Sequence, residues 1–143
     1  MIGLIISGHG HFGTGLQSSL KLIAGESTNT QFIDFEESDS TDSLKKKYIQ
    51  ALSHLNNCDD ILALTDLAGG SPFKTLVELS YESSQKIQVI GGSNLPMILE
   101  ISMTKDIFSD LDSLCESALT TGKDSVVKFA LVDHTEIEDE DGI

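Results

Sequence analysis

The amino-acid sequence predicts an α/β fold, an open, doubly wound and mostly parallel β-sheet with helices on both faces. Short apolar runs, typical of buried strands, alternate along the chain with segments whose apolar residues recur at helical spacing. The connections are short, and neither a repeat nor a linker interrupts them. A chain of 143 residues is the usual size of one domain. We therefore expect a single domain over residues 1–132, followed by an acidic tail over 133–143 that is predicted to be disordered.

The first half of the chain contains two predicted strands and two predicted helices. Residues 2–7 are an apolar run that predicts a buried strand, and a glycine-rich turn follows it. The next helix should end at Gly25, a residue that suits a helix C-terminus. Residues 30–35 predict a second strand. Behind a Ser- and Asp-rich loop over residues 38–43, apolar residues keep helical spacing as far as Leu55.

The middle of the chain repeats this alternation. Residues 61–65 predict a third buried strand. In the helix that follows, Ser71 is the expected N-cap and Pro72 the first helical residue. Residues 86–90 predict a fourth strand, which ends at a pair of glycines.

Two helices and a last strand complete the prediction. One helix should start at Asn94 and run to Met103, and another should span residues 109–119 and stop at Gly122. Residues 126–132 predict a fifth strand before the acidic tail.

Composition excludes several classes of function. With 23 acidic residues, 9 lysines and no arginine, the net charge of −14 argues against nucleic-acid binding. Two separated cysteines fit a reduced, cytoplasmic protein. No apolar run is long enough to span a bilayer, so we expect no membrane insertion.

His9 is the first candidate for chemistry. In open parallel sheets, ligands gather at the carboxyl ends of the strands, and His9 lies there between two glycines, Gly8 and Gly10. Flanking glycines leave an imidazole accessible and let backbone N–H groups approach an anion. A neutral imidazole is a nucleophile when its other nitrogen is held by an acceptor. A turn histidine that bonds nearby backbone remains the open alternative.

Asp66 is the expected partner of His9. It follows the third strand, and if the first and third strands are neighbours its carboxylate can reach the first loop. The turn behind it contains Gly70 and Ser71, which bring free helix N–H groups near Asp66. Turn or cap roles explain Asp66 and Ser71 equally simply. Together the two loops predict a His–Asp site that binds a phosphoryl group.

Other assignments of the histidines fit less well. His9 and His11 could pair on a metal, but no third His or Cys stands at suitable spacing and Asp66 is the only candidate carboxylate, so we expect no metal. Phosphoglycerate-mutase-like enzymes surround their phosphorylated histidine with arginines, which this chain lacks. The glycines after Gly8 do not have dinucleotide-binding or P-loop spacing. We expect His54 and His134 to be solvated.

The sequence resembles the IIA components of the mannose family of the bacterial phosphoenolpyruvate-dependent sugar phosphotransferase system. The resemblance extends to about Val132. It rests on a hydrophobic strand that leads into Ser7-Gly8-His9-Gly10, on Phe35, on Asp66 followed by Gly69-Gly70-Ser71-Pro72-Phe73, and on Gly91-Gly92-Ser93-Asn94-Leu95-Pro96-Met97.

The resemblance implies a phosphocarrier that acts as a protein-histidine phosphotransferase. His9 would accept phosphate on Nε2 from the histidine-containing phosphocarrier protein and pass it to a IIB component, while Asp66 holds Nδ1. The turn at Gly70 and Ser71 would contact the phosphate, and we also expect contacts from N–H groups near Gly10. No organic cofactor is expected, because donor and acceptor are both protein histidines.

The resemblance also implies an assembly and leaves two alternatives open. Family members are homodimers that exchange the last strand, here residues 126–132, and work beside the IIC and IID membrane components. One alternative is a phosphotransfer subunit that serves a dihydroxyacetone kinase. The other is a non-catalytic regulatory module with the same fold. The transported sugar is not readable from the sequence.

Overall fold

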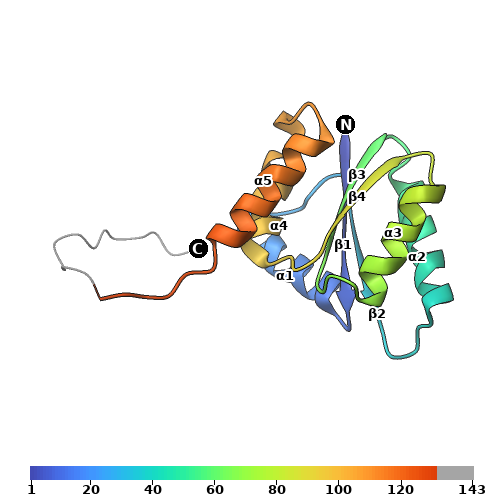
Figure 1. Ribbon diagram of the computed structural model, residues 1–143, viewed down its shortest axis with the longest axis horizontal. Coiled ribbons are helices and arrows are strands. Elements are labelled where there is room, and N and C mark those ends of the chain that lie inside the picture. The colour runs from blue at the N-terminus through green and yellow to red at the C-terminus, as the bar shows by residue number, and fades with distance from the viewer. Residues whose placement is uncertain (132–143) are drawn as a thin grey trace.

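The computed structural model describes residues 1–131 of the chain and contains a parallel sheet wrapped by helices (Figure 1). The elements in chain order are β1 (Ile2–His9), α1 (Phe12–Ala24), β2 (Thr30–Phe35), α2 (Thr41–His54), β3 (Asp60–Thr65), α3 (Ser71–Glu82), β4 (Lys86–Ile90), α4 (Leu95–Thr104), the short 3₁₀-helix η1 (Lys105–Ile107) and α5 (Leu111–Asp124). The α/β class expected from the alternation is therefore confirmed.

All strand pairs in the sheet are parallel, in the order β2-β1-β3-β4. The neighbouring position of β1 and β3, on which the predicted His–Asp pair depends, is confirmed. In the register, Ser7 of β1 lies beside Thr65 of β3, and His9 lies beside Phe35 of β2. The carboxyl ends of the three strands therefore meet at one edge.

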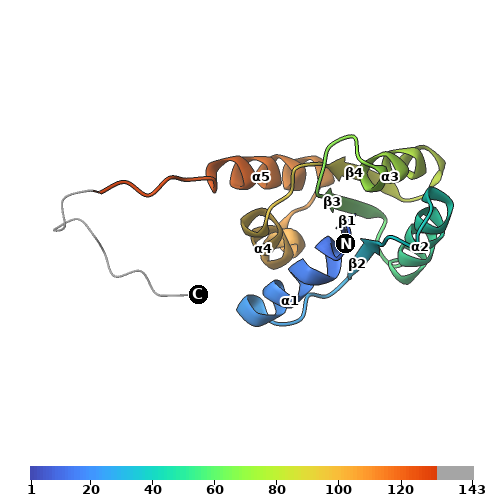
Figure 2. The ribbon, with the colours of Figure 1, turned by 90° about the horizontal axis from the view of Figure 1, so that it is seen from below.

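Two apolar layers hold helices on the two faces of the sheet. On one face, α1, α4 and α5 cover one set of strand residues, which includes Leu4 and Ile6 of β1. On the other face, α2 and α3 cover the alternate set, which includes Ile5 of β1. Figure 2 shows the helices divided in this way about the sheet. Because successive strand residues point to opposite faces, an apolar run such as residues 4–6 supplies both layers at once.

Two helix ends differ from the expectation. Helix α5 does not stop at Gly122 but continues to Asp124, and Gly122 is buried. A Cβ at Gly122 would overlap Cε of Met97, so this glycine permits close packing of α5 on α4. The N-cap of α3 is Gly70, and Ser71 is already helical with Pro72 behind it.

The predicted fifth strand is not observed in the part of it that the structure describes. Residues 126–131 have no strand or helix, and Val126, Val127, Phe129 and Leu131 are exposed. Val132 and the acidic tail at 133–143 lie outside the described residues. Within residues 1–131 no helix is both long and apolar enough to cross a membrane.

Candidate functional site

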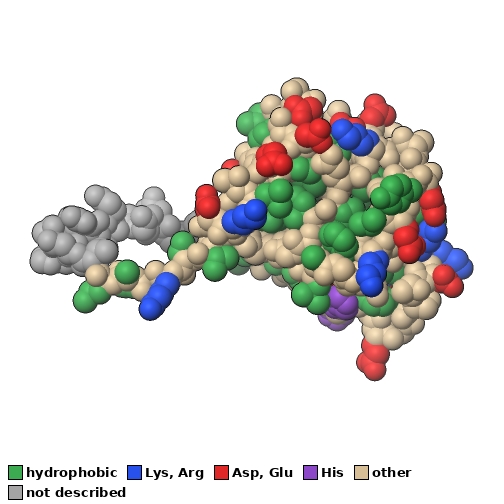
Figure 3. All heavy atoms as spheres, in the orientation of Figure 1, with side chains coloured by type: hydrophobic (Ala, Val, Ile, Leu, Met, Phe, Trp, Pro, Cys, Tyr) green, Lys and Arg blue, Asp and Glu red, His purple; other side chains and the backbone are tan. Residues whose placement is uncertain are grey.

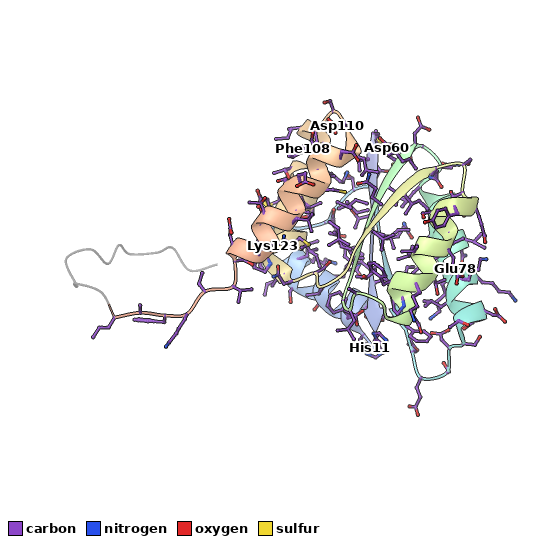
Figure 4. All side chains as sticks on the ribbon, in the orientation of Figure 1. His11, Asp60, Glu78, Phe108, Asp110 and Lys123 are labelled. Carbon is purple, nitrogen blue, oxygen red and sulfur yellow. The ribbon has the colours of Figure 1, made fainter. Side chains whose placement is uncertain are left out.

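The site lies at the carboxyl ends of β1, β2 and β3. Figure 4 shows His11, two residues past the end of β1, at the lower end of the molecule, whereas Asp60, the first residue of β3, lies at the upper end. Histidine side chains are visible at the same lower edge in the space-filling view (Figure 3). The strand ends thus bring together residues that are far apart in the sequence, as the topology rule for open sheets requires.

His9 and Asp66 form a hydrogen-bonded pair. Oδ2 of Asp66 lies 2.8 Å from Nδ1 of His9, and it also accepts a hydrogen bond of 2.8 Å from the His9 backbone N–H. The other oxygen, Oδ1, accepts the N–H of Leu67 at 2.8 Å. A carboxylate only accepts hydrogen bonds, so Nδ1 carries the proton and Nε2 carries the lone pair. The His9 side chain is 44% exposed, and Nε2 makes no hydrogen bond within residues 1–131.

Asp66 is held in its charged form. Burial raises the pKa of its carboxyl, but hydrogen bonds from the His9 N–H, the His9 ring and the Leu67 N–H outweigh burial, and the pKa falls below its ordinary value of 3.8. Asp66 is therefore a carboxylate at neutral pH. A negative charge at this position stabilises a cation that forms on the neighbouring imidazole.

Two glycines make room for this pair. A Cβ at Gly8 would lie 2.7 Å from Cγ of Asp66 and 2.7 Å from the Phe12 ring. A Cβ at Gly70 would lie 2.9 Å from Cε1 of His9. Real Cβ atoms do not approach other atoms so closely, so a side chain at either position would displace the pair. Both glycines serve here through the close approach that they allow.

The N-terminus of α3 lies against the His9 ring. Gly70 abuts Cε1, the ring carbon between Nδ1 and Nε2. Within residues 1–131 the N–H groups of Ser71 and Phe73 make no hydrogen bond, and Pro72 between them has no N–H. The N–H of Gly70 is bonded to the Leu67 carbonyl at 3.1 Å. Two unpaired donors and the positive end of the helix dipole make this turn a suitable anion site.

Gly10 lies at the sharp turn that follows β1. Its φ of 59° lies in the left-handed region that glycine favours. Its N–H donates to the carbonyl of Phe35 at 2.8 Å. That donor is already paired, so a phosphate contact at Gly10 stays a prediction that requires this bond to open. The observed role of Gly10 is to turn the chain sharply from β1 toward α1.

Two residues of β2 belong to the site, of which sequence reasoning missed Asp34 and noted Phe35 only as a marker of the family resemblance. The Phe35 ring packs edge-on against the His9 ring, with centroids 5.8 Å apart. Asp34 is buried, and its carboxylate accepts the Thr14 N–H at 2.9 Å and the Thr14 hydroxyl at 2.6 Å. Thr14 lies in the first turn of α1, so Asp34 caps α1 from a neighbouring strand. The parallel pairing of β1 with β2 was the signal that could have placed both residues here.

A buried hydroxyl pair lies beneath the site. Oγ of Ser7 and Oη of Tyr48 are 2.7 Å apart, and both side chains are fully buried. Burial raises the pKa of the Tyr48 hydroxyl, so Tyr48 stays a neutral hydrogen-bonding group. The pair joins α2 to β1 two residues before His9. The remaining histidine of the domain, His54, lies exposed at the end of α2, as predicted.

Comparison with known proteins agrees with this fold and its strand order. Residues 3–119 match the family of the PTS system fructose IIA component. The fructose-specific EIIA component of the phosphotransferase system of Bacillus subtilis is 30% identical, with 98% of this chain and 99% of that protein aligned. The mannose-specific EIIAB component of Escherichia coli K12 is 31% identical over 87% of this chain, which spans only 38% of that longer protein.

Solved structures give the same result. The crystal structure of phosphotransferase system component EIIA from Streptococcus agalactiae superposes with a TM-score of 0.83 at 34% identity, and covers 90% of this chain and 97% of that one. The mannose/sorbose-specific IIA subunit from Enterococcus faecalis shares the fold, with a TM-score of 0.82 at 24% identity over 92% of this chain and 96% of its own. The chain therefore belongs to the mannose family of IIA components of the sugar phosphotransferase system.

Proposed function

We propose that the chain is a phosphocarrier that accepts a phosphoryl group on Nε2 of His9 from the histidine-containing phosphocarrier protein and passes it to a IIB component. The observation that supports this most strongly is the 2.8 Å contact between Nδ1 of His9 and Asp66, because it leaves the lone pair of the partly exposed ring on Nε2. Membership of a phosphotransferase family points to the same reaction class.

The transfer balances without a metal, a cofactor or an exchanged proton. The Nε2 lone pair attacks phosphorus in line with the donor nitrogen, the new N–P bond forms, and the old N–P bond breaks. The donor ring leaves as neutral imidazole, and the His9 ring becomes cationic while it keeps its Nδ1 proton. The Asp66 carboxylate stabilises that cation, and the unpaired N–H groups of Ser71 and Phe73 are placed to bind the phosphoryl oxygens.

Phosphorylation followed by intact-mass spectrometry at alkaline pH tests the proposal. The protein is mixed with phosphoenolpyruvate, enzyme I and the carrier protein. We expect wild type and His11→Ala to gain the mass of one phosphoryl group and His9→Ala to gain none. His11 is the matched control because it is exposed and lies two residues away. Equal labelling of His9→Ala, or no labelling of wild type, would contradict the proposal, and the latter result would favour a regulatory module.

We also propose that the chain works as a homodimer in which residues 126–132 of each copy pair with the other copy. Among the described residues, β4 is an edge strand without a neighbour on its outer side. Beside it is a hollow of about 520 Å³ lined by Val89 and Ile90 of β4 and by Leu119 of α5. An open strand edge beside exposed apolar chain favours strand addition between copies.

Molar mass in solution tests the dimer. Light scattering should give twice the chain mass of 15.4 kDa for wild type and for the control Lys128→Ala. Phe129→Asp places a charge on the segment that would be covered, so its mass should fall toward that of one chain. A monomeric wild type would contradict the assembly.

A further inference from the structure

The end of β2 and the start of α1 bring together three potential metal ligands that the phosphoryl site does not use. The parallel pairing places Asp34 beside Gly8 and Phe35 beside His9, so Glu36 and His11 follow at the same edge. One ligand atom from each of His11, Asp34 and Glu36 can be chosen so that all three lie within 4.8 Å of one another. His11 is more than twenty positions away from Asp34 and Glu36 in the sequence, so spacing alone did not suggest the cluster.

The geometry is close to that of a coordinated ion. The centre of a triangle with 4.8 Å sides is about 2.8 Å from each corner, whereas Zn²⁺ lies about 2.0–2.2 Å from its nitrogen and oxygen ligands. The side chains of His11 and Glu36 are exposed and free to close by less than about 1 Å. Asp34 is the fixed member, because Thr14 holds both its oxygens, and each oxygen keeps a further lone pair for a metal.

The local charge favours a cation. One short stretch of chain carries four carboxylates, at Asp34, Glu36, Glu37 and Asp39. Lys47 is the cation that forms an ion pair with one of them, Asp39. Lys47 is already bonded to the Asp34 carbonyl at 3.0 Å and to Asp39 at 2.6 Å. It does not contact the Asp34 carboxylate. A buried carboxylate without a cationic partner is stabilised by a metal ion.

The space at the cluster suits a partly hydrated ion. A hollow of about 460 Å³ opens beside it, lined by Gly10, His11, Glu36, Glu37 and Ser38. The ring of His11 stands at the N-cap position of α1 and makes no capping hydrogen bond, so its nitrogens are available. Waters in the hollow can complete the coordination shell.

From these observations we propose that His11, Asp34 and Glu36 bind a divalent transition-metal ion, of which Zn²⁺ is the best match. One imidazole and two carboxylates form a nitrogen and oxygen donor set that suits Zn²⁺ and Co²⁺ better than the oxygen-only sites of Ca²⁺ or Mg²⁺. The ion would lie at the same edge of the sheet as His9, since Phe35 pairs with His9 and Glu36 follows Phe35.

Titration with Co²⁺, read by its visible absorption, and with Zn²⁺, read by calorimetry, tests this site on the unphosphorylated full chain. We expect one ion per chain. His11→Ala should weaken binding by at least the roughly 10- to 100-fold that loss of a second-shell partner costs, and Glu36→Gln should weaken it less. His9→Ala and His54→Ala are matched controls and should bind like wild type. Circular dichroism confirms that each variant is folded.

Two results would overturn the metal site. The first is unchanged affinity in His11→Ala, and the second is loss of binding in His9→Ala, which would place the ion on the phosphoryl site instead. Paramagnetic shifts of the His11 ring protons in the Co²⁺-loaded wild type give a readout that does not depend on any variant. Because these measurements need no phosphoryl donor, their failure leaves the phosphocarrier proposal untouched.

Discussion

Helices α1 and α3 both begin at the carboxyl edge of the sheet beside His9, but their first turns are satisfied in different ways. In α1 the carboxylate of Asp34 accepts the Thr14 N–H, while the N–H groups of Phe12 and Gly13 have no partner within residues 1–131. In α3 the N–H groups of Ser71 and Phe73 have no partner within residues 1–131. A carboxylate of the protein therefore already counters the positive end of α1, whereas none accepts a hydrogen bond from the first turn of α3 within the described residues. On the proposed function, this difference predicts a structural role for α1 and a phosphate-binding role for α3.

Asp66→Asn should have the largest effect on the rate of phosphoryl acceptance. The amide keeps the shape of the side chain but presents a neutral group to Nδ1, so the tautomer and the charge that favour attack by Nε2 are both lost. We expect phosphoryl acceptance to slow on the order of 10³- to 10⁴-fold, as for loss of the orienting carboxylate in hydrolase triads. Rates come from time-resolved intact-mass spectra. Asp60→Asn at the opposite end of β3 is the control, and a rate near wild type for Asp66→Asn would refute the role of the carboxylate.

Gly70→Ala should disturb the same side through geometry alone. The added Cβ would meet Cε1 of His9 at 2.9 Å, so the ring must shift away from the α3 N-terminus. A misplacement of this kind costs about 100-fold in rate. Gly15→Ala in α1 is the matched control, because a Cβ there meets nothing within 4 Å. Equal rates for the two variants would show that α3 need not approach the ring.

Asp34→Ala should remove the cap of α1 and lower the stability of the fold without affecting phosphoryl transfer. Removing this cap leaves the Thr14 N–H and hydroxyl without their acceptor, so the free energy of unfolding should fall by about 1–2 kcal/mol. Urea unfolding followed by circular dichroism measures the change. Phosphoryl acceptance should stay within a few-fold of wild type, and a loss as large as that of Gly70→Ala would mean that both helices serve the phosphate.

Acid should reduce the contribution of Asp66 to the free energy of unfolding. The folded-state pKa of Asp66 lies below its ordinary value of 3.8. At pH values between these two pKa values, the folded chain binds fewer protons than the unfolded chain. The contribution of Asp66 to stability is therefore fully present above about pH 4 and is lost as the pH falls through the folded-state pKa. The unfolding free energy of Asp66→Asn should fall less steeply with acid than that of wild type. Parallel curves for the two proteins would contradict the pKa shift.

Much of the fold and half of the site followed from the sequence. Strand periodicity gave β2 and β4 their observed bounds, and the rule for parallel sheets brought His9 and Asp66 together. Rules based on local sequence gave wrong helix ends at the two positions where a tertiary contact determines the residue. Gly122 is a stop signal by type but a packing residue against Met97, and Gly70 replaces Ser71 as the cap because the His9 ring leaves no room for a side chain there.

The unpredicted part of the site depends on side chains that meet only after β2 pairs with β1. Asp34 has no local signal as a cap, because the helix that it caps begins more than twenty residues earlier in the sequence. The cluster of His11, Asp34 and Glu36 depends on the same pairing. Residues 126–131 illustrate the opposite case, since their apolar pattern predicts a strand and the structure shows none there.

Nitrogen-15 NMR of the histidine rings tests most directly the claim that Asp66 reserves Nε2 for the phosphoryl group. Before phosphorylation, the His9 ring should show a protonated Nδ1 and an unprotonated Nε2 at neutral pH. After phosphorylation, coupling to ³¹P should appear at Nε2, and Nδ1 should keep its proton. Phosphate on Nδ1 of His9, or an unphosphorylated ring protonated at Nε2, would contradict the account.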